Sequence, residues 1–193
     1  MIASARQSIA GVYGIEMDFV IVDGGSQDGT AKWCQSQPDI TLIEHGELLG
    51  AIKAFNDGAF RADGEYVILA NDDIEFIDDS ILIAYRFMQN NPECGIGCFY
   101  QNRNGRDWHI EHMPAVEGGK QVYRYYGQVC IVPKWLGDHV HWWGNPDQFI
   151  AKGLKPPRTY GGANELSCNV YELGYKVLPI LPDRPVARFG SSR

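Results

Sequence analysis

The sequence contains no apolar run that approaches the about 20 residues that a helix needs to span a bilayer. It also lacks a basic segment followed by an apolar one near its start, so we expect no signal peptide. Positive charge is in the minority, because 17 lysines and arginines face 24 aspartates and glutamates, which gives a net charge of −7. These absences predict a cytoplasmic protein, free or peripheral to a membrane, with no transmembrane segment and no nucleic-acid partner.

Cysteines are few, odd in number and scattered, and none of them shows the spacing of a zinc knuckle. The five lie mostly inside apolar segments, as Cys34, Cys94, Cys98, Cys130 and Cys168. We therefore expect buried, reduced thiols. Internal repeats and low-complexity stretches are also absent, and 193 residues suit one domain with a substantial core.

Helices and strands are expected to alternate over the first 100 residues. Apolar runs without polar alternation predict strands buried on both faces, and apolar residues three and four apart predict helices. The expected helices are 1–14, 30–37, 48–62 and 80–90, and the expected strands are 18–22, 40–43, 65–70 and 95–100. This alternation of strands and helices predicts an α/β fold with a doubly wound, mainly parallel sheet.

After residue 100 the pattern becomes polar and aromatic, and regular signals are sparse. A strand, a helical turn, a long loop, a helix and a last strand are expected at 129–132, 134–138, 139–162, 165–173 and 177–181. The last dozen residues contain proline and arginine, and we expect a solvated tail there.

Two predicted strands end in carboxylates. Residues 19–30 read Phe-Val-Ile-Val-Asp-Gly-Gly-Ser-Gln-Asp-Gly-Thr, and a second apolar run ends in Asn71-Asp72-Asp73. The carboxyl ends of strands in an open α/β sheet line one crevice. Hard oxygen ligands gathered there suit a nucleotide and a divalent cation. The alternative is that these polar residues merely cap the strands.

Four ordered motifs resemble those of family 2 glycosyltransferases of the GT-A fold. Residues 22–30 resemble the signature VDDGSxDGT, and 71–73 match the position of the DxD motif. Residues 46–58 resemble the segment between these two motifs more loosely. Residues 161–177 resemble the block GG-[ED]-D-x-[DE]-L-S…GY-[KR]-V. The ordered set covers most of residues 18–181, whereas each motif alone is weak.

The resemblance implies a site for a nucleoside-diphosphate sugar. Its donor-binding residues would be Asp23, Gly24, Ser26, Asp28, Asn71 and Asp72, and its metal ligand Asp73, for Mg²⁺ or Mn²⁺. Gly24 and Gly25 would let the ligand approach the backbone, while Asp28 could equally cap the helix that follows it.

The sequence departs from the family at the catalytic base. Inverting transfer needs a carboxylate that deprotonates the acceptor hydroxyl. Counting back from Leu166-Ser167, that position holds Ala163, and Glu165 matches a second acidic position. Three accounts stay open: an engineered knock-out, a naturally inactive protein, or catalysis by Glu165 or another carboxylate from a shifted position.

A second departure lies at the beginning of the sequence. The family normally starts with an apolar strand, whereas Met1 here leads directly into the helix that would follow it. We expect a truncated chain whose sheet lacks its first strand. A neighbouring molecule could supply a strand there, or the edge could stay open.

The sequence thus predicts a single GT-A-like domain over 1–193, with a nucleotide-binding half at about 1–100, an acceptor-side half at about 101–181 and the tail at 182–193. The expected enzyme moves a sugar from a nucleoside-diphosphate sugar to a carbohydrate or other hydroxyl acceptor, with inversion implied by the resemblance. The alternative is a non-catalytic domain of the same fold that binds a nucleotide-sugar or a carbohydrate. A sugar-phosphate nucleotidyltransferase is disfavoured, because it would need a loop rich in glycine and in arginine or lysine on its first strand, and that segment is absent.

Overall fold

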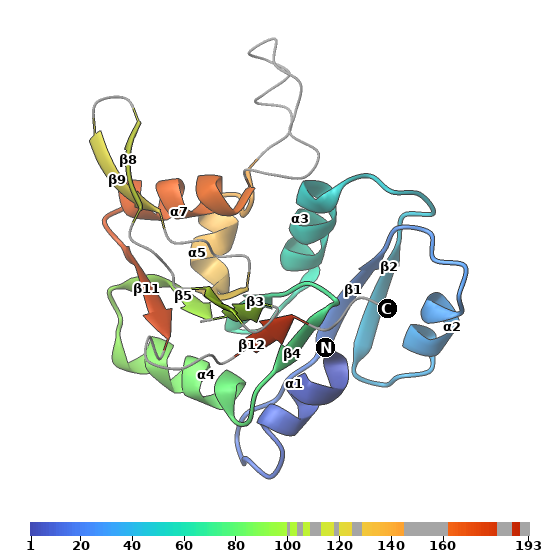
Figure 1. Ribbon diagram of the computed structural model, residues 1–193. Helices are drawn as coiled ribbons and strands as arrows, with labels where there is room; N and C mark the ends of the chain where they lie inside the picture. The colour runs from blue at the N-terminus through green and yellow to red at the C-terminus, as the bar shows by residue number, and fades with distance from the viewer. Residues whose placement is uncertain are drawn as a thin grey trace.

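The computed structural model describes residues 1–99, 101–103, 106–108, 113–117, 120–124, 129–144, 162–180 and 187–189, which form an α/β fold (Figure 1). The helices are α1 (Ile2–Ser8), α2 (Thr30–Gln35), α3 (Ala51–Arg61), α4 (Ser80–Asn90), α5 (Lys134–His139) and α7 (Gly162–Glu172). The strands are β1 (Phe19–Asp23), β2 (Ile40–Glu44), β3 (Tyr66–Leu69), β4 (Ile74–Phe76), β5 (Cys94–Phe99), β6 (Gln101–Arg103), β7 (Arg106–Trp108), β8 (Met113–Glu117), β9 (Lys120–Arg124), β10 (Cys130–Pro133), β11 (Lys176–Ile180) and β12 (Ala187–Phe189). None of the described helices has the length and apolar character that crossing a membrane requires.

β1 and β2 form a small parallel sheet of two strands. β1 pairs with β2 in register from Phe19↔Ile40 to Asp23↔Glu44. Because β1 and β2 are parallel, a crossover must join them, and α2 supplies it and packs on β2. The carboxyl end of β1 therefore points toward the same edge as that of β2, where the predicted acidic turn begins.

A four-stranded sheet in the order β11-β5-β10-β3 forms the centre of the molecule. β11 and β5 are parallel, whereas β10 runs antiparallel to both of its neighbours. Helices α3, α5 and α7 cover one face and α1 and α4 the other (Figure 1). The α/β fold class is confirmed, and the sequence had not indicated the direction of β10.

Most predicted elements lie within a few residues of their expected bounds, and α4 coincides with its prediction. The exception is α1, which was expected over 1–14 but ends at Ser8. Gly11 and Gly14 adopt positive φ angles of 78° and 79°, which a right-handed helix cannot continue through.

Six short strands were missed, namely β4, β6, β7, β8, β9 and β12. β12 corrects the prediction of a solvated tail, because the backbone of 187–189 lies between β4 and β6. The other residues from 181 to 193 and most of the expected loop 139–162 lie outside the described residues.

The prediction of reduced, mostly buried cysteines is confirmed. None of the five forms a disulfide with another, and four of them are buried. Burial raises the pKa of the Cys94 thiol to about 11 and that of Cys130 to about 12. Thiols with such pKa values stay protonated near neutral pH and act as small apolar groups in the core.

Candidate functional site

The carboxyl end of β1 is fixed by hydrogen bonds to Asp23. This side chain is 7% exposed, and its two oxygens accept the backbone N–H of Ser26 at 3.2 and 3.1 Å. The Ser26 hydroxyl donates to the same carboxylate. The Asp23 carbonyl accepts the backbone N–H of His45 at 2.9 Å. Asp23 thus orders the turn that follows β1 and presents Ser26 at its surface.

The two glycines after Asp23 bring this turn against the segment that follows β2. Gly25 has a φ of +98°, and a Cβ there would lie 2.7 Å from the Gly46 carbonyl oxygen. A Cβ on Gly24 would lie 2.7 Å from Leu48 Cδ2. The expected reason for these glycines was access of a ligand to the backbone. The structure adds a packing reason, which for Gly25 is contact between two backbones.

Asp28 is engaged at the start of α2. Its Oδ1 accepts the hydroxyl of Thr30 at 2.6 Å and the backbone N–H of Thr30 at 3.0 Å. These hydrogen bonds, that of the hydroxyl first, lower the pKa of the exposed Asp28 carboxyl below its ordinary value. Asp28 thus makes the local helix-start contacts that the sequence left as an alternative to ligand binding.

The carboxyl end of β3 forms the second acidic corner. Asn71 is half-buried, and its carbonyl accepts the backbone N–H of Ile74 at 3.4 Å, which closes a turn into β4. Asp72 and Asp73 occupy the centre of this turn and are exposed. The turn therefore presents two adjacent carboxylates to solvent on a short connection between two strands.

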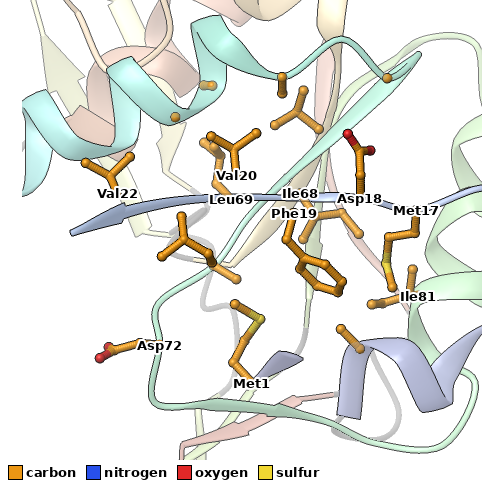
Figure 2. Close-up of a pocket in the computed structure, with 18 of the residues that line it drawn as sticks. Met1, Met17, Asp18, Phe19, Val20, Val22, Ile68, Leu69, Asp72 and Ile81 are labelled. Carbon is orange, nitrogen blue, oxygen red and sulfur yellow. The ribbon is translucent and has the colours of Figure 1, made fainter. Parts of the chain in front are cut away.

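One cavity of about 760 Å³ joins the two corners. All six predicted donor-binding residues line it, namely Asp23, Gly24, Ser26, Asp28, Asn71 and Asp72, whereas Asp73 does not. Figure 2 shows Val22 and Asp72 toward one end of this cavity and Met17 and Asp18 toward the other. The fold thus brings together residues that are up to about 50 positions apart in the sequence, at the strand ends where α/β proteins bind ligands.

The carboxylates of the second acidic corner, Asp72 and Asp73, could bind a hard cation such as Mg²⁺ only together with other ligands. Among the described residues, no group of three or more histidine, cysteine or acidic side chains could enclose a metal ion. Asp72 and Asp73 are nevertheless adjacent, exposed carboxylates beside the cavity. Mg²⁺ is commonly bound by one or two carboxylates together with water and substrate phosphates. The donor set fits a cation of this kind.

The residues expected at the catalytic base lie at the beginning of α7. Ala163 and Glu165 both fall in its first turn, where Glu165 is the acidic residue. The Glu165 carboxylate lies against Gly144, because a Cβ built on Gly144 would be 2.3 Å from Glu165 Cδ. Gly144 also has a φ of +88°. Close approach and backbone conformation both require glycine at this position.

Asn56 is a site residue whose role the sequence did not indicate. It is buried on α3, where its Nδ2 donates to the Gly144 carbonyl at 2.8 Å and its Oδ1 accepts the Trp143 N–H at 3.0 Å. Phe55 stacks on Trp143 with ring centroids 3.9 Å apart. Asn56 had been noted only within the loosely matching segment 46–58. It connects α3, which packs on β1, to the segment beside Glu165.

Asp57 on α3 belongs to a cluster of charged side chains with His45 and Lys53. The Asp57 carboxylate lies 2.7 Å from His45 Nε2 and 2.8 Å from Lys53 Nζ. Burial alone would raise the pKa of Asp57, but the hydrogen bonds from Lys53 and His45 hold it below its ordinary value. Because the backbone of His45 is bonded to Asp23, this cluster links α3 to the first acidic corner.

An α/β sheet covered by helices on both faces, with an acidic cavity at its strand ends, has the architecture of the GT-A class of glycosyltransferases. A family model shows the membership directly: the chain belongs to Glycosyl transferase family 2, whose model matches residues 1–152. No curated protein matches the chain.

Solved structures share the fold at low sequence identity. S. aureus TarS 1–349 in complex with UDP has a TM-score of 0.67 at 15% identity, and the match covers 100% of this chain and 56% of that one. TarS 1–349 in complex with UDP-GlcNAc has a TM-score of 0.66 at 14% identity, with 100% and 54% covered. The mannosyltransferase PcManGT from Pyrobaculum calidifontis, in complex with GDP-Man and Mn²⁺, has a TM-score of 0.53 at 18% identity, with 88% and 49% covered. The chain therefore spans about half the length of these structures.

Proposed function

We propose that this chain binds the nucleoside-diphosphate sugar of a family 2 glycosyltransferase that transfers the sugar to a carbohydrate or other hydroxyl acceptor. The observation that carries the proposal is the shared cavity, because the six residues expected to bind the donor all line it. The solved structures with UDP, UDP-GlcNAc and GDP-Man support this class of ligand. The family membership supports the class of reaction.

In this proposal the first corner recognises the nucleoside and the second corner the diphosphate. Hydrogen bonds from Ser26 hold the Asp23 carboxylate in one orientation before a ligand binds. Its remaining lone pairs can then accept hydrogen bonds from the nucleoside without further loss of side-chain entropy. Asp73, with Asn71 or Asp72 on the ribose or on a metal-bound water, would hold Mg²⁺ or Mn²⁺. Such a cation, when bound, neutralises charge on the diphosphate leaving group. The Mn²⁺ in the PcManGT complex supports this choice of metal.

On the acceptor side, an inverting reaction requires a base near the beginning of α7. The first turn of this helix offers Glu165 as its acidic residue and an alanine at 163. This alanine favours a second candidate function, a non-catalytic domain that binds a nucleotide-sugar or a carbohydrate. In both candidates the donor corner works in the same way, so that binding and turnover have to be measured separately.

Donor binding is tested by calorimetric titration of UDP and GDP with and without Mn²⁺. We expect Mn²⁺-dependent binding of one nucleotide, which Asp73→Asn weakens about tenfold or more by removing a charged ligand. Asp23→Asn should weaken binding with and without the metal. Asp63→Asn is the matched control, since Asp63 is exposed and lies outside the cavity lining. Absence of binding to either nucleotide would contradict the proposal.

Turnover is tested by release of nucleotide from the corresponding sugar donor in the presence of candidate acceptors. We expect Ala163→Asp to raise the rate about 100-fold or more, because a positioned general base contributes at least that much. Ala163→Asn, which has nearly the same shape without the charge, is the control. Equal rates for the unmodified chain and Ala163→Asp would reject position 163 as that of the base. Loss of activity in Glu165→Gln would then assign the role to Glu165.

A further inference from the structure

The first acidic corner is supported by the segment that follows β2. The ladder between β1 and β2 ends at Asp23↔Glu44, and the next residue, His45, donates its backbone N–H to the Asp23 carbonyl at 2.9 Å. The chain then turns at Gly46, whose φ is +72°. The Gly46 carbonyl oxygen is the group that a Cβ on Gly25 would meet at 2.7 Å. The position of residues 45 and 46 therefore determines where the turn after Asp23 can lie.

The side chain of His45 fixes this segment to α3. It is 9% exposed, and its Nε2 lies 2.7 Å from the Asp57 carboxylate. Although burial favours the neutral acid, the hydrogen bonds from Lys53 and His45 hold the pKa of Asp57 below its ordinary value. Because an ionised carboxylate only accepts hydrogen bonds, His45 carries a proton on Nε2 and donates it to Asp57. His45 thus binds the first acidic corner through its backbone and α3 through its ring.

α3 is itself held at a fixed place on β1. The helix packs on this strand (Figure 1), and a Cβ on Gly58 would lie 3.3 Å from Val22 Cγ2. Gly58 follows Asp57 in the sequence, and Val22 precedes Asp23. The contacts therefore form a closed set, from β1 to the segment after β2, from this segment to α3, and from α3 back to β1. Of the three side chains in the charged cluster, His45 alone comes from outside α3.

We infer that His45 is a positioning residue of the donor site, which holds the turn after β1 in the geometry that binds the nucleoside. The inference rests on the proposed function, because it concerns the ligand that the first corner would recognise. His45 does not line the cavity, whereas Asp23, Gly24 and Ser26 do, so His45 acts through them. A turn that is held in place before binding loses less conformational entropy when the ligand arrives. Without the bond to Asp57, the segment after β2 could move and the turn would lose this support.

A matched pair of amide variants tests the ring of His45. The side-chain amide of glutamine reaches the place of Nε2, whereas that of asparagine ends near the place of Nδ1. We therefore expect His45→Gln to keep the bond to Asp57 and His45→Asn to lose it. In calorimetric titrations of UDP and GDP, His45→Asn should weaken binding about fivefold and His45→Gln less than about twofold. The loss should be the same with and without Mn²⁺, because the first corner binds the nucleoside and not the metal.

A second measurement needs no nucleotide. The backbone N–H of Ser26 donates to the Asp23 carboxylate, so its hydrogen exchange reports whether the turn is held. We expect exchange at this amide to be about fivefold faster in His45→Asn and unchanged in His45→Gln. Lys53→Ala is the control, because it removes the other partner of Asp57 and leaves His45 in place. It should change neither the Ser26 exchange nor the nucleotide affinity.

Circular dichroism shows whether the variants are folded. If His45→Asn does not fold, Asp57→Ala removes the same bond from the other side and takes its place. Nucleotide binding that is equal in His45→Asn and His45→Gln would overturn the inference alone, as would equal exchange at Ser26. A loss of affinity that appears only with Mn²⁺ would also overturn it, since the effect would then lie at the second corner. If neither UDP nor GDP binds the unmodified chain, the proposed function fails and the inference fails with it.

Discussion

β1 and β5 are both short apolar strands, yet the structure surrounds them differently. Every residue of β5 is buried, since β10 and β11 pair with its two edges and helices cover its faces. In β1 only the first and last residues are buried, and the central Val20, Ile21 and Val22 are half-buried and line the cavity. The same kind of sequence thus forms a fully buried strand in β5 and a partly buried one in β1 beside the first acidic corner. Burial of a strand depends on its neighbours as much as on its own residues.

The largest expected difference between the two strands comes from substitutions that probe packing. A Cβ on Gly95 in β5 would lie 2.5 Å from Val170 Cγ1 and 2.8 Å from Tyr175 Cβ. We expect Gly95→Ala to lower the free energy of unfolding by about 3 kcal/mol, because overpacking forces the backbone to move. Val20→Ala in β1 should cost only about 1 kcal/mol, since the neighbours of Val20 can relax toward the cavity. Urea denaturation measures both, and equal costs would show that β1 is as tightly packed as β5.

The sequence predicted the well-packed region and the acidic corners better than the rest. Strands such as β5 and helices such as α4 have their own apolar pattern, so their local sequence predicts them. β4 and β12 have three residues each and form because distant segments pair, as Ala187 does with Phe76. Local patterns carry little information on such pairs.

The residues of the candidate site also fall into those that the sequence predicted and those that it did not. Asp23 and Asn71-Asp72 were predicted because strand ends and motifs mark them, and the fold brings them to one cavity. Asn56 lies in the loosely matching segment 46–58, but its role was not predicted because its partners are backbone groups of Trp143 and Gly144, almost 90 positions away. Nothing in its neighbours along the chain distinguishes a buried asparagine with such partners from an exposed one.

Asn56 tests whether α3 and the segment beside Glu165 form one unit. We expect Asn56→Ala to cost about 2–3 kcal/mol, because it leaves the Trp143 N–H and the Gly144 carbonyl without this buried partner. The change should also alter the fluorescence of Trp143, which stacks on the adjacent Phe55. Lys53→Ala, on an exposed position of the same helix, is the control. A cost below that of Lys53→Ala would show that the connection is not needed.

Gly144 and Gly14 separate backbone strain from close contact. Both have positive φ angles, of 88° and 79°, but only Gly144 has a neighbour where a Cβ would lie, the Glu165 carboxylate. Gly14→Ala should cost about 1 kcal/mol from the backbone alone. Gly144→Ala should cost about 2 kcal/mol, because the Glu165 side chain must also move. Thermal unfolding measures the pair, and identical shifts in Tm would contradict the observed contact.

The smallest effect concerns the charged cluster of Asp57, His45 and Lys53, which lies beside the end of β1. The pKa of Asp57 is lowered in the folded protein by its bonds to Lys53 and His45, so the unfolded state binds its proton more tightly. The stability that this difference supplies is therefore fully present above the ordinary aspartate pKa and is lost as the pH falls through the folded value. We expect a contribution below about 1 kcal/mol, since Asp57 is partly exposed.

Denaturation in urea as a function of pH measures this contribution. The acid loss of stability should be shallower in Asp57→Asn, whose side chain keeps its shape but does not titrate. Asp63→Asn is the control, because Asp63 is exposed and takes no part in the cluster of Asp57, His45 and Lys53. A profile that is the same for Asp57→Asn and the unmodified chain would mean that packing alone holds α3 against the first acidic corner. The two regions would then differ in the completeness of their sheets and not in the kind of interaction that stabilises them.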